Sequence, residues 1–250
     1  MSNVPAIQET KPDFLTTETE PFGVENLNAY LKPARLKIVQ PTAGEQFSAF
    51  APGDVLIVPA MHLVAPKDEP FRFVPLFFFP QWCLWNPLAM KGQLPMIRES
   101  SLDPQSQLAI ASRNPATREK VCPENPTLTC KVSEHLNIVM LLQEGDEALR
   151  MMPILCSFAR GEHTTGSTLL QMIKLRQASI FGCVFEAKST VRTNTKGRWF
   201  GLDITNPAQG SWIKDASQYE AYKHLHNEYK KAHADRAIVV DYEEDITDAG

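Results

Sequence analysis

The chain has 250 residues and a formal net charge of -4, with 43% hydrophobic and 22% charged residues. This length and composition allow a substantial buried core. The longest apolar run, 73–84, is broken by prolines and is too short for the roughly 20 residues that span a bilayer. The N-terminal region lacks the basic and apolar pattern of a signal segment, so we expect no secretory signal, and five irregularly spaced cysteines favour free thiols. We expect a cytoplasmic protein that does not contact a membrane.

The chain begins with a polar segment and then turns to strand-forming sequence. Residues 1–27 are rich in Thr, Glu and Pro, which predicts a disordered acidic arm. A single folded domain is expected over 28–237. Its first strands are predicted at 36–39 and 55–58, where β-branched and apolar residues are bounded by turn residues.

The middle of the chain combines an aromatic strand with a proline-rich segment. Residues 71–85 predict a strand covered on both faces, and strict alternation places Phe71, Phe73, Phe77 and Phe79 on one face. Six prolines between 86 and 126 predict a long, mostly irregular insertion with a short helix at 106–113. Long loops of this kind commonly carry function.

The second half has more regular patterns. Strands are expected at 135–142, 151–158, 180–188 and 198–204, with the last two joined as a hairpin through 193–197. Apolar residues at helical spacing predict helices at 167–177, capped by Thr164 or Thr165, and at 217–233, capped by Asp215 or Ser217.

Charge is unevenly distributed along this half. Eight Lys or Arg and only two carboxylates lie between Arg150 and Arg198, whereas the last thirteen residues, 238–250, hold five carboxylates and no base. This pattern indicates a surface that binds a polyanion, followed by an acidic tail. The tail either docks on partner proteins, covers the binding groove, or only aids solubility.

The basic hairpin and the helix before it provide the candidate binding residues. Cations can follow the phosphates of a single strand while aromatic rings stack on its unpaired bases. The candidates are Arg160, Lys174, Arg176, Lys188, Arg192, Lys196, Arg198, Trp199 and Phe200, with Trp82 and Trp85 as further stacking rings. The alternative is that the hairpin charges are merely solvated and that Trp199 belongs to the core.

Catalytic and metal motifs are not recognisable. Cys122, Cys130 and His135 lack a Cys-x2-Cys spacing and a fourth ligand, so zinc binding stays an alternative and no metal or cofactor is expected. There is no P-loop and no recognisable nucleophile with its base. We expect a protein that is not an enzyme, although a nuclease with dispersed carboxylates would not show a local motif.

The segments 185–188 and 196–202, the order strand, helix, strand, hairpin, and the closing helix with its acidic tail resemble phage-type single-stranded DNA-binding proteins. The resemblance covers the second half and implies an OB-fold. It also implies recruitment of replication or recombination proteins by the tail, although the chain ends in Asp248-Ala249-Gly250 without a terminal aromatic residue.

The resulting prediction is a β-rich α+β protein with an OB-like barrel, the proline-rich insertion at 86–126 and a C-terminal helix. It would bind single-stranded DNA in phage DNA replication, recombination or repair, in the host cytoplasm, with homo-oligomerisation left open. The alternative is a structural or assembly protein of a phage virion or scaffold, whose aromatic strand forms an oligomer interface.

Overall fold

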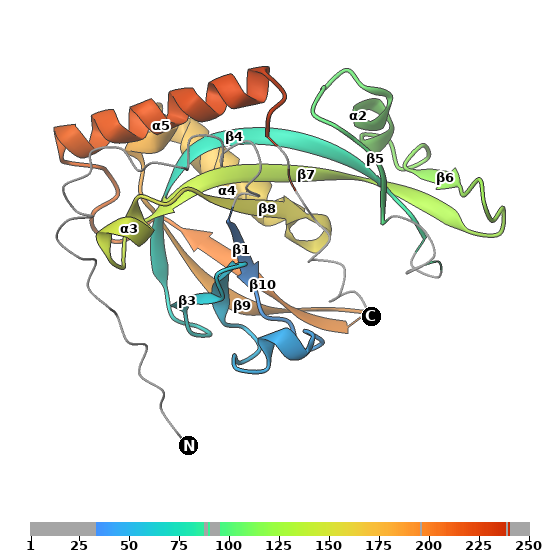
Figure 1. The fold of residues 1–250 in the computed structure, drawn as a ribbon, viewed down its shortest axis with the longest axis horizontal. Helices are drawn as coiled ribbons and strands as arrows, with labels where there is room; N and C mark the ends of the chain where they lie inside the picture. The colour runs from blue at the N-terminus through green and yellow to red at the C-terminus, as the bar shows by residue number, and fades with distance from the viewer. Residues whose placement is uncertain (1–33, 88–89, 91–95, 196, 239, 241–250) are drawn as a thin grey trace, which may run out of the picture. The chain divides into compact units, whose positions relative to one another are not determined.

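The computed structural model describes residues 34–87, 90, 96–195, 197–238 and 240. Contacts divide the chain into Met1–Lys32 and Pro33–Gly250, and every described residue lies in the second unit. The described residues form a β-rich α+β fold, in which one sheet curls into a half-barrel (Figure 1).

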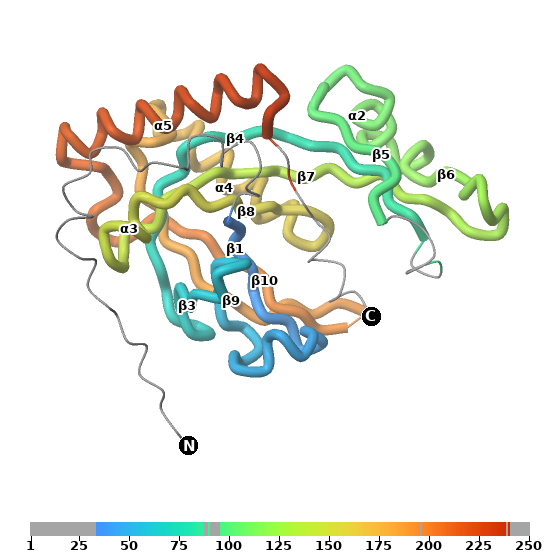
Figure 2. Tube along the Cα trace, viewed as in Figure 1, coloured from blue at the N-terminus to red at the C-terminus, as the bar shows by residue number. Residues whose placement is uncertain are grey.

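The sheet has ten strands within the described residues. The strands are β1 (Arg35–Ile38), β2 (Val55–Val58), β3 (His62–Ala65), β4 (Phe71–Trp85), β5 (Ile97–Ser101), β6 (Glu119–Val121), β7 (Thr129–Leu142), β8 (Ile154–Ala159), β9 (Phe185–Asn194) and β10 (Gly197–Thr205). Their order is β10-β9-β4-β7-β8-β1-β2-β3, with β5 paired to β4 and β6 to β7. All pairs are antiparallel except β1 with β8. Figure 2 shows β9, β10 and β1 curving away from the long strands β4 and β7.

Helices cover parts of this sheet. The described helices are α2 (Gln107–Ser112), α3 (Glu147–Arg150), α4 (His163–Leu175), α5 (Ala216–Ala234) and the short 3-10 helices η2 (Glu45–Phe47), η4 (Arg160–Glu162) and η5 (Ile180–Gly182). The C-terminal helix α5 begins as predicted, since the Asp215 carboxylate accepts the Gln218 N–H at 2.8 Å. No helix in the described ranges is long and apolar enough to cross a bilayer.

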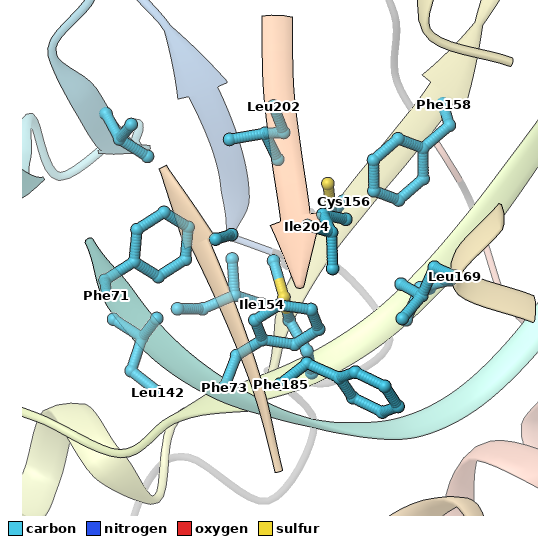
Figure 3. Packing of buried hydrophobic residues seen from close by; sticks show 14 of the residues in the cluster. Phe71, Phe73, Leu142, Ile154, Cys156, Phe158, Leu169, Phe185, Leu202 and Ile204 are labelled. Carbon is cyan, nitrogen blue, oxygen red and sulfur yellow. The ribbon is translucent and has the colours of Figure 1, made fainter. Parts of the chain in front are cut away.

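Two apolar clusters hold the sheet and helices together. The first fills the inside of the curl, where Phe73, Phe185 and Ile154 meet Leu169 of α4 (Figure 3). The second lies between β4, β7 and α5 and contains Tyr222, which is 1% exposed. Tyr219, Leu225 and Tyr229 pack beside it, so the helical spacing of apolar residues that predicted this helix is confirmed.

The aromatic strand β4 differs from strict alternation. Phe71 and Phe73 belong to the first cluster, whereas Phe77 and Phe79 pack in the second. The prediction that all four rings share one face is wrong, because the register with β7 shifts between Pro75 and Phe77. A β-bulge adds one residue to a strand, so every later side chain changes face.

The proline-rich segment contains more regular structure than its composition predicts. The helix expected at 106–113 is present as α2, with Ser106 as its cap. The segment also contributes β5 and β6, which extend the outer ends of β4 and β7. Neither of these strands was predicted, since their short polar sequences show no strand pattern.

Candidate functional site

A cleft of about 1160 Å³ lies beside β1 and β8. The pairing of these two strands is limited to Arg35 with Leu155 and does not continue along the rest of β1. Its lining also includes β7 residues from Thr129 to His135, a stretch of strand about 20 Å long at roughly 3.3 Å per residue. Small-molecule pockets are usually about 300–1,000 Å³, so the length and volume favour an extended ligand.

The cleft carries an excess of positive charge. The Lys and Arg residues that line it are Arg35, Lys37, Arg118, Lys131 and Arg160, and the carboxylates are Glu119, Glu134 and Glu162. Glu119 pairs with Lys131, itself a cleft cation, at 2.9 Å, and Glu134 contacts His163 at 3.0 Å. The five cations exceed the three carboxylates by two. An anionic chain would therefore meet a surface with more cations than anions.

Strand β1 places two of these cations where the chain is otherwise apolar. Arg35 and Lys37 are 8% and 7% exposed. The ammonium of Lys37 lies 4.6 Å from the centre of the Phe47 ring, and this cation–π contact compensates part of the cost of burial. Neither residue was predicted from the sequence as a binding residue, although cations alternate with apolar residues in Arg35–Ile38.

A fixed aromatic ring lies in the cleft wall at the outer end of β4. The indole Nε1 of Trp85 donates to Ser133 Oγ at 2.6 Å, and Ser133 Oγ lies 2.9 Å from His135 Nε2. Burial and the charges of Arg160, Arg35 and His163 lower the pKa of His135 to about 3. Such a histidine stays neutral but is a weak base, so this serine–histidine contact is poorly suited to nucleophilic catalysis.

Arg160 covers this ring. Its guanidinium carbon lies 5.1 Å from the centre of a Trp85 ring, and the residue is exposed. Arg160 begins η4 with a φ of 50°, in the left-handed region that non-glycine residues rarely adopt. Residues held in this region are enriched at functional sites.

Glu162 connects η4 to the edge of β10. Its carboxylate accepts the indole N–H of Trp199 at 3.2 Å and the backbone N–H of Leu202 at 3.1 Å. Gly201 leaves the space for this carboxylate, since a Cβ there would overlap it. The predicted stacking residue Trp199 is thus half-buried against η4.

Of the nine predicted binding residues, those that line the cleft are Arg160 and Phe200. Phe200 is 5% exposed, and its ring lies against the Gly53 backbone as well as under Lys67, so it offers no face that a side-chain movement could open. Trp82, a further candidate, is 2% exposed and packs beside α2. Among the rings proposed from sequence, Trp85 has the best position because it lines the cleft.

The cations of the β9–β10 hairpin divide between two faces. Lys188 and Arg192 lie opposite Asp203 and Trp199, whereas Arg198 lies opposite Thr193 on the other face. Arg192 also donates to the Leu202 carbonyl at 2.9 Å. Lys196 lies outside the described residues. The hairpin is confirmed as an element, but none of its described cations lines the cleft.

The predicted cations in the last turn of α4 and at its C-cap have different surroundings. Lys174 is exposed on the helix. Arg176 donates to the Ser211 carbonyl at 2.6 Å, and its guanidinium lies over the rings of Phe185 and Trp212, at 4.2 Å and 5.2 Å. These contacts connect α4 to the loop after β10 and give Arg176 a structural role.

The cysteines named in the zinc alternative lie near β6. Cys122 Sγ donates to Glu124 at 3.2 Å, and the bidentate contact of Arg98 lowers the pKa of Glu124 to about 2. Burial raises the pKa of Cys130. His135 lies in the cleft instead, and the described part of the chain contains no group of three or more His, Cys, Asp or Glu arranged for a metal ion.

The fold and the cleft together define a β-rich α+β protein with a cationic, ring-containing groove. A family model described as Pam3 phage gp34-like protein matches residues 61–235, which is most of the chain, so the chain belongs to this family. The description of the family suggests a bacteriophage protein. Comparisons with curated proteins and with solved structures gave no match.

Proposed function

We propose that this protein binds single-stranded DNA, without catalysis, in the cleft beside β1 and η4. The observation that supports this most is the excess of cations around a cleft of about 1160 Å³ that also contains Trp85. Single-strand binding combines a positive groove for the phosphates with rings for the bases. The protein would act in phage DNA replication, recombination or repair, with the acidic tail as a contact for partner proteins.

The binding surface that we propose differs from the one expected from sequence. Arg160 stays in it, while Arg35, Lys37, Arg118 and Lys131 replace the hairpin cations. We also propose that the curled sheet is related to the OB-fold, a partly open barrel that binds oligonucleotides on one side. The sheet would then be an enlarged form, since an OB barrel has five strands.

A salt-dependent titration tests the function directly. Fluorescence anisotropy with labelled oligo-dT and with a duplex of equal length should show tighter binding of the single strand. For three to five neutralised phosphates, log K should fall with log salt at a slope of about -2 to -3.5. The absence of oligo-dT binding at low salt, or equal affinity for the duplex, would contradict the proposal.

The assembly alternative loses its original basis in the aromatic strand. Phe71, Phe73 and Phe79 are each at most 3% exposed, because other parts of the same chain cover them. An oligomer interface would have to use residues other than these three rings. Light scattering at several concentrations, together with the titration, separates the two proposals: a large assembly without DNA affinity favours the alternative. Metal-dependent degradation of the labelled strand would instead show a nuclease.

A further inference from the structure

We propose that the ring of Trp85, beneath Arg160, is a binding site for one unpaired base. When the base enters, Arg160 leaves the ring and contacts the adjoining phosphate. This inference depends on the proposed function and adds the chemical group that the cleft recognises. The site is a ring face and not a hydrogen-bonding pattern, so it should accept any base.

The Trp85 ring is held in place before any ligand binds. Its Nε1 donates to Ser133 Oγ at 2.6 Å, and the His135 ring lies 5.6 Å from it with an interplanar angle of 34°. The strand register sets Trp85 opposite Lys131, beside Ser133 on the neighbouring strand. A ring fixed in this way loses little conformational entropy when a base stacks on it.

Arg160 occupies the ring face that a base would use. Its guanidinium lies over the ring at 5.1 Å, and Arg160 is an exposed residue at the cleft rim. A base that stacks on the ring would replace the contact between the ring and the guanidinium. The displaced guanidinium keeps its charge and can bind a phosphate through two N–H groups.

The position of the ring also explains a preference for single strands. Trp85 is 7% exposed and lies in the cleft wall, so only a base that can leave its own stack reaches the ring. The bases of a duplex are paired and stacked, and unstacking them costs free energy. An abasic strand has the same phosphates but no ring to insert.

The test compares oligo-dT with an abasic strand of equal length and charge, both bound to the full chain. Oligo-dT should bind about 5- to 150-fold more tightly, the effect expected from one stacked base. Trp85→Leu should bring this ratio close to one. Trp212→Leu is the matched control, because Trp212 also lies beside an arginine, Arg176, but does not line the cleft. It should keep the ratio of the unchanged protein.

Two further measurements keep the test decisive if Trp85→Leu does not fold. Photocrosslinking of the unchanged protein with an iododeoxyuridine strand should modify Trp85. Arg160→Gly should weaken oligo-dT more than the abasic strand, because only an entering base releases Arg160 to a phosphate; glycine accepts the left-handed φ, so the backbone of η4 is kept.

The outcomes separate this inference from the proposed function. Tight binding of both strands with a ratio near one, a ratio unchanged in Trp85→Leu, or crosslinks only at other residues would each overturn the base site and leave strand binding intact. If neither strand binds, the proposed function fails and the base site fails with it.

Discussion

The side-chain amide of Gln40 forms two hydrogen bonds with the backbone of Phe200. Its Oε1 accepts the Phe200 N–H at 2.9 Å, and its Nε2 donates to the Phe200 carbonyl at 3.0 Å. Gln40 follows β1, while Phe200 lies in β10 at the edge of the sheet. The amide thus replaces a neighbouring strand at this edge and brings β10 to the rim of the cleft.

Gln40→Ala should destabilise the protein by about 1–3 kcal/mol, because two backbone groups of Phe200 lose their partner in a half-buried place. Urea unfolding followed by circular dichroism measures this change. Gln171→Ala, at an exposed position of α4, should stay within about 0.5 kcal/mol of the unchanged protein. Equal midpoints for the two variants would show that the Gln40 amide does not hold the edge.

Glu162→Gln should also be destabilising, by about 1–2 kcal/mol. The two carboxylate oxygens accept the indole N–H of Trp199 and the backbone N–H of Leu202. A glutamine amide has only one oxygen, so its NH2 group would face one of these two N–H donors and leave that donor without an acceptor. Urea unfolding measures the loss, with Glu228→Gln on exposed α5 as the control. A midpoint as high as that of the control would contradict the assigned contact.

Charge reversal distinguishes the cleft from the hairpin. Arg118→Glu with Lys131→Glu should weaken oligo-dT binding at low salt and make the salt slope shallower by about 1.4, as expected for two lost phosphate contacts. Lys196→Glu with Arg198→Glu changes the net charge equally outside the set of cleft residues, and should have a smaller effect. Anisotropy titrations at four salt concentrations provide the comparison. If the hairpin variant binds oligo-dT more weakly than the cleft variant, the binding site lies on the hairpin and not in the cleft.

Protonation of His135 should make stability depend on pH between about 6.5 and 3. Its folded pKa, lowered to about 3, lies below that of the unfolded chain, so unfolding takes up a proton in this interval. Stability should therefore fall as the pH drops, by up to about 1.4 kcal/mol per pH unit from this group.

His135→Gln removes this contribution and should flatten the decline between pH 6.5 and 4.5, as measured by urea unfolding at half-unit intervals. His224→Gln, on the exposed side of α5, should keep the slope of the unchanged protein. Identical slopes in both variants would mean that His135 does not stay neutral in the folded protein.

Local sequence signals predicted many of the secondary-structure elements. The capping residue Asp215, the turn before Gly197 and the apolar periodicity of α4 act over a few residues, so their outcome can be read from the chain. The bulge after Pro75 could not be predicted, because it depends on the register with β7, which lies some 60 positions later in the sequence. The short strands β3, β5 and β6 likewise depend on their partners.

The sequence by itself determined which kinds of groups the protein has for binding: many cations in the second half, an acidic tail and several aromatic side chains. The tertiary structure decided which of these groups meet. Curling of the sheet brings Arg35 and Lys37 of β1 to the same cleft as Trp85 and Arg160, and leaves Lys188 and Arg198 on different faces of a hairpin. The physical reason is that strand pairing and burial act between residues far apart in the chain, so charge density along the sequence does not determine charge density in space.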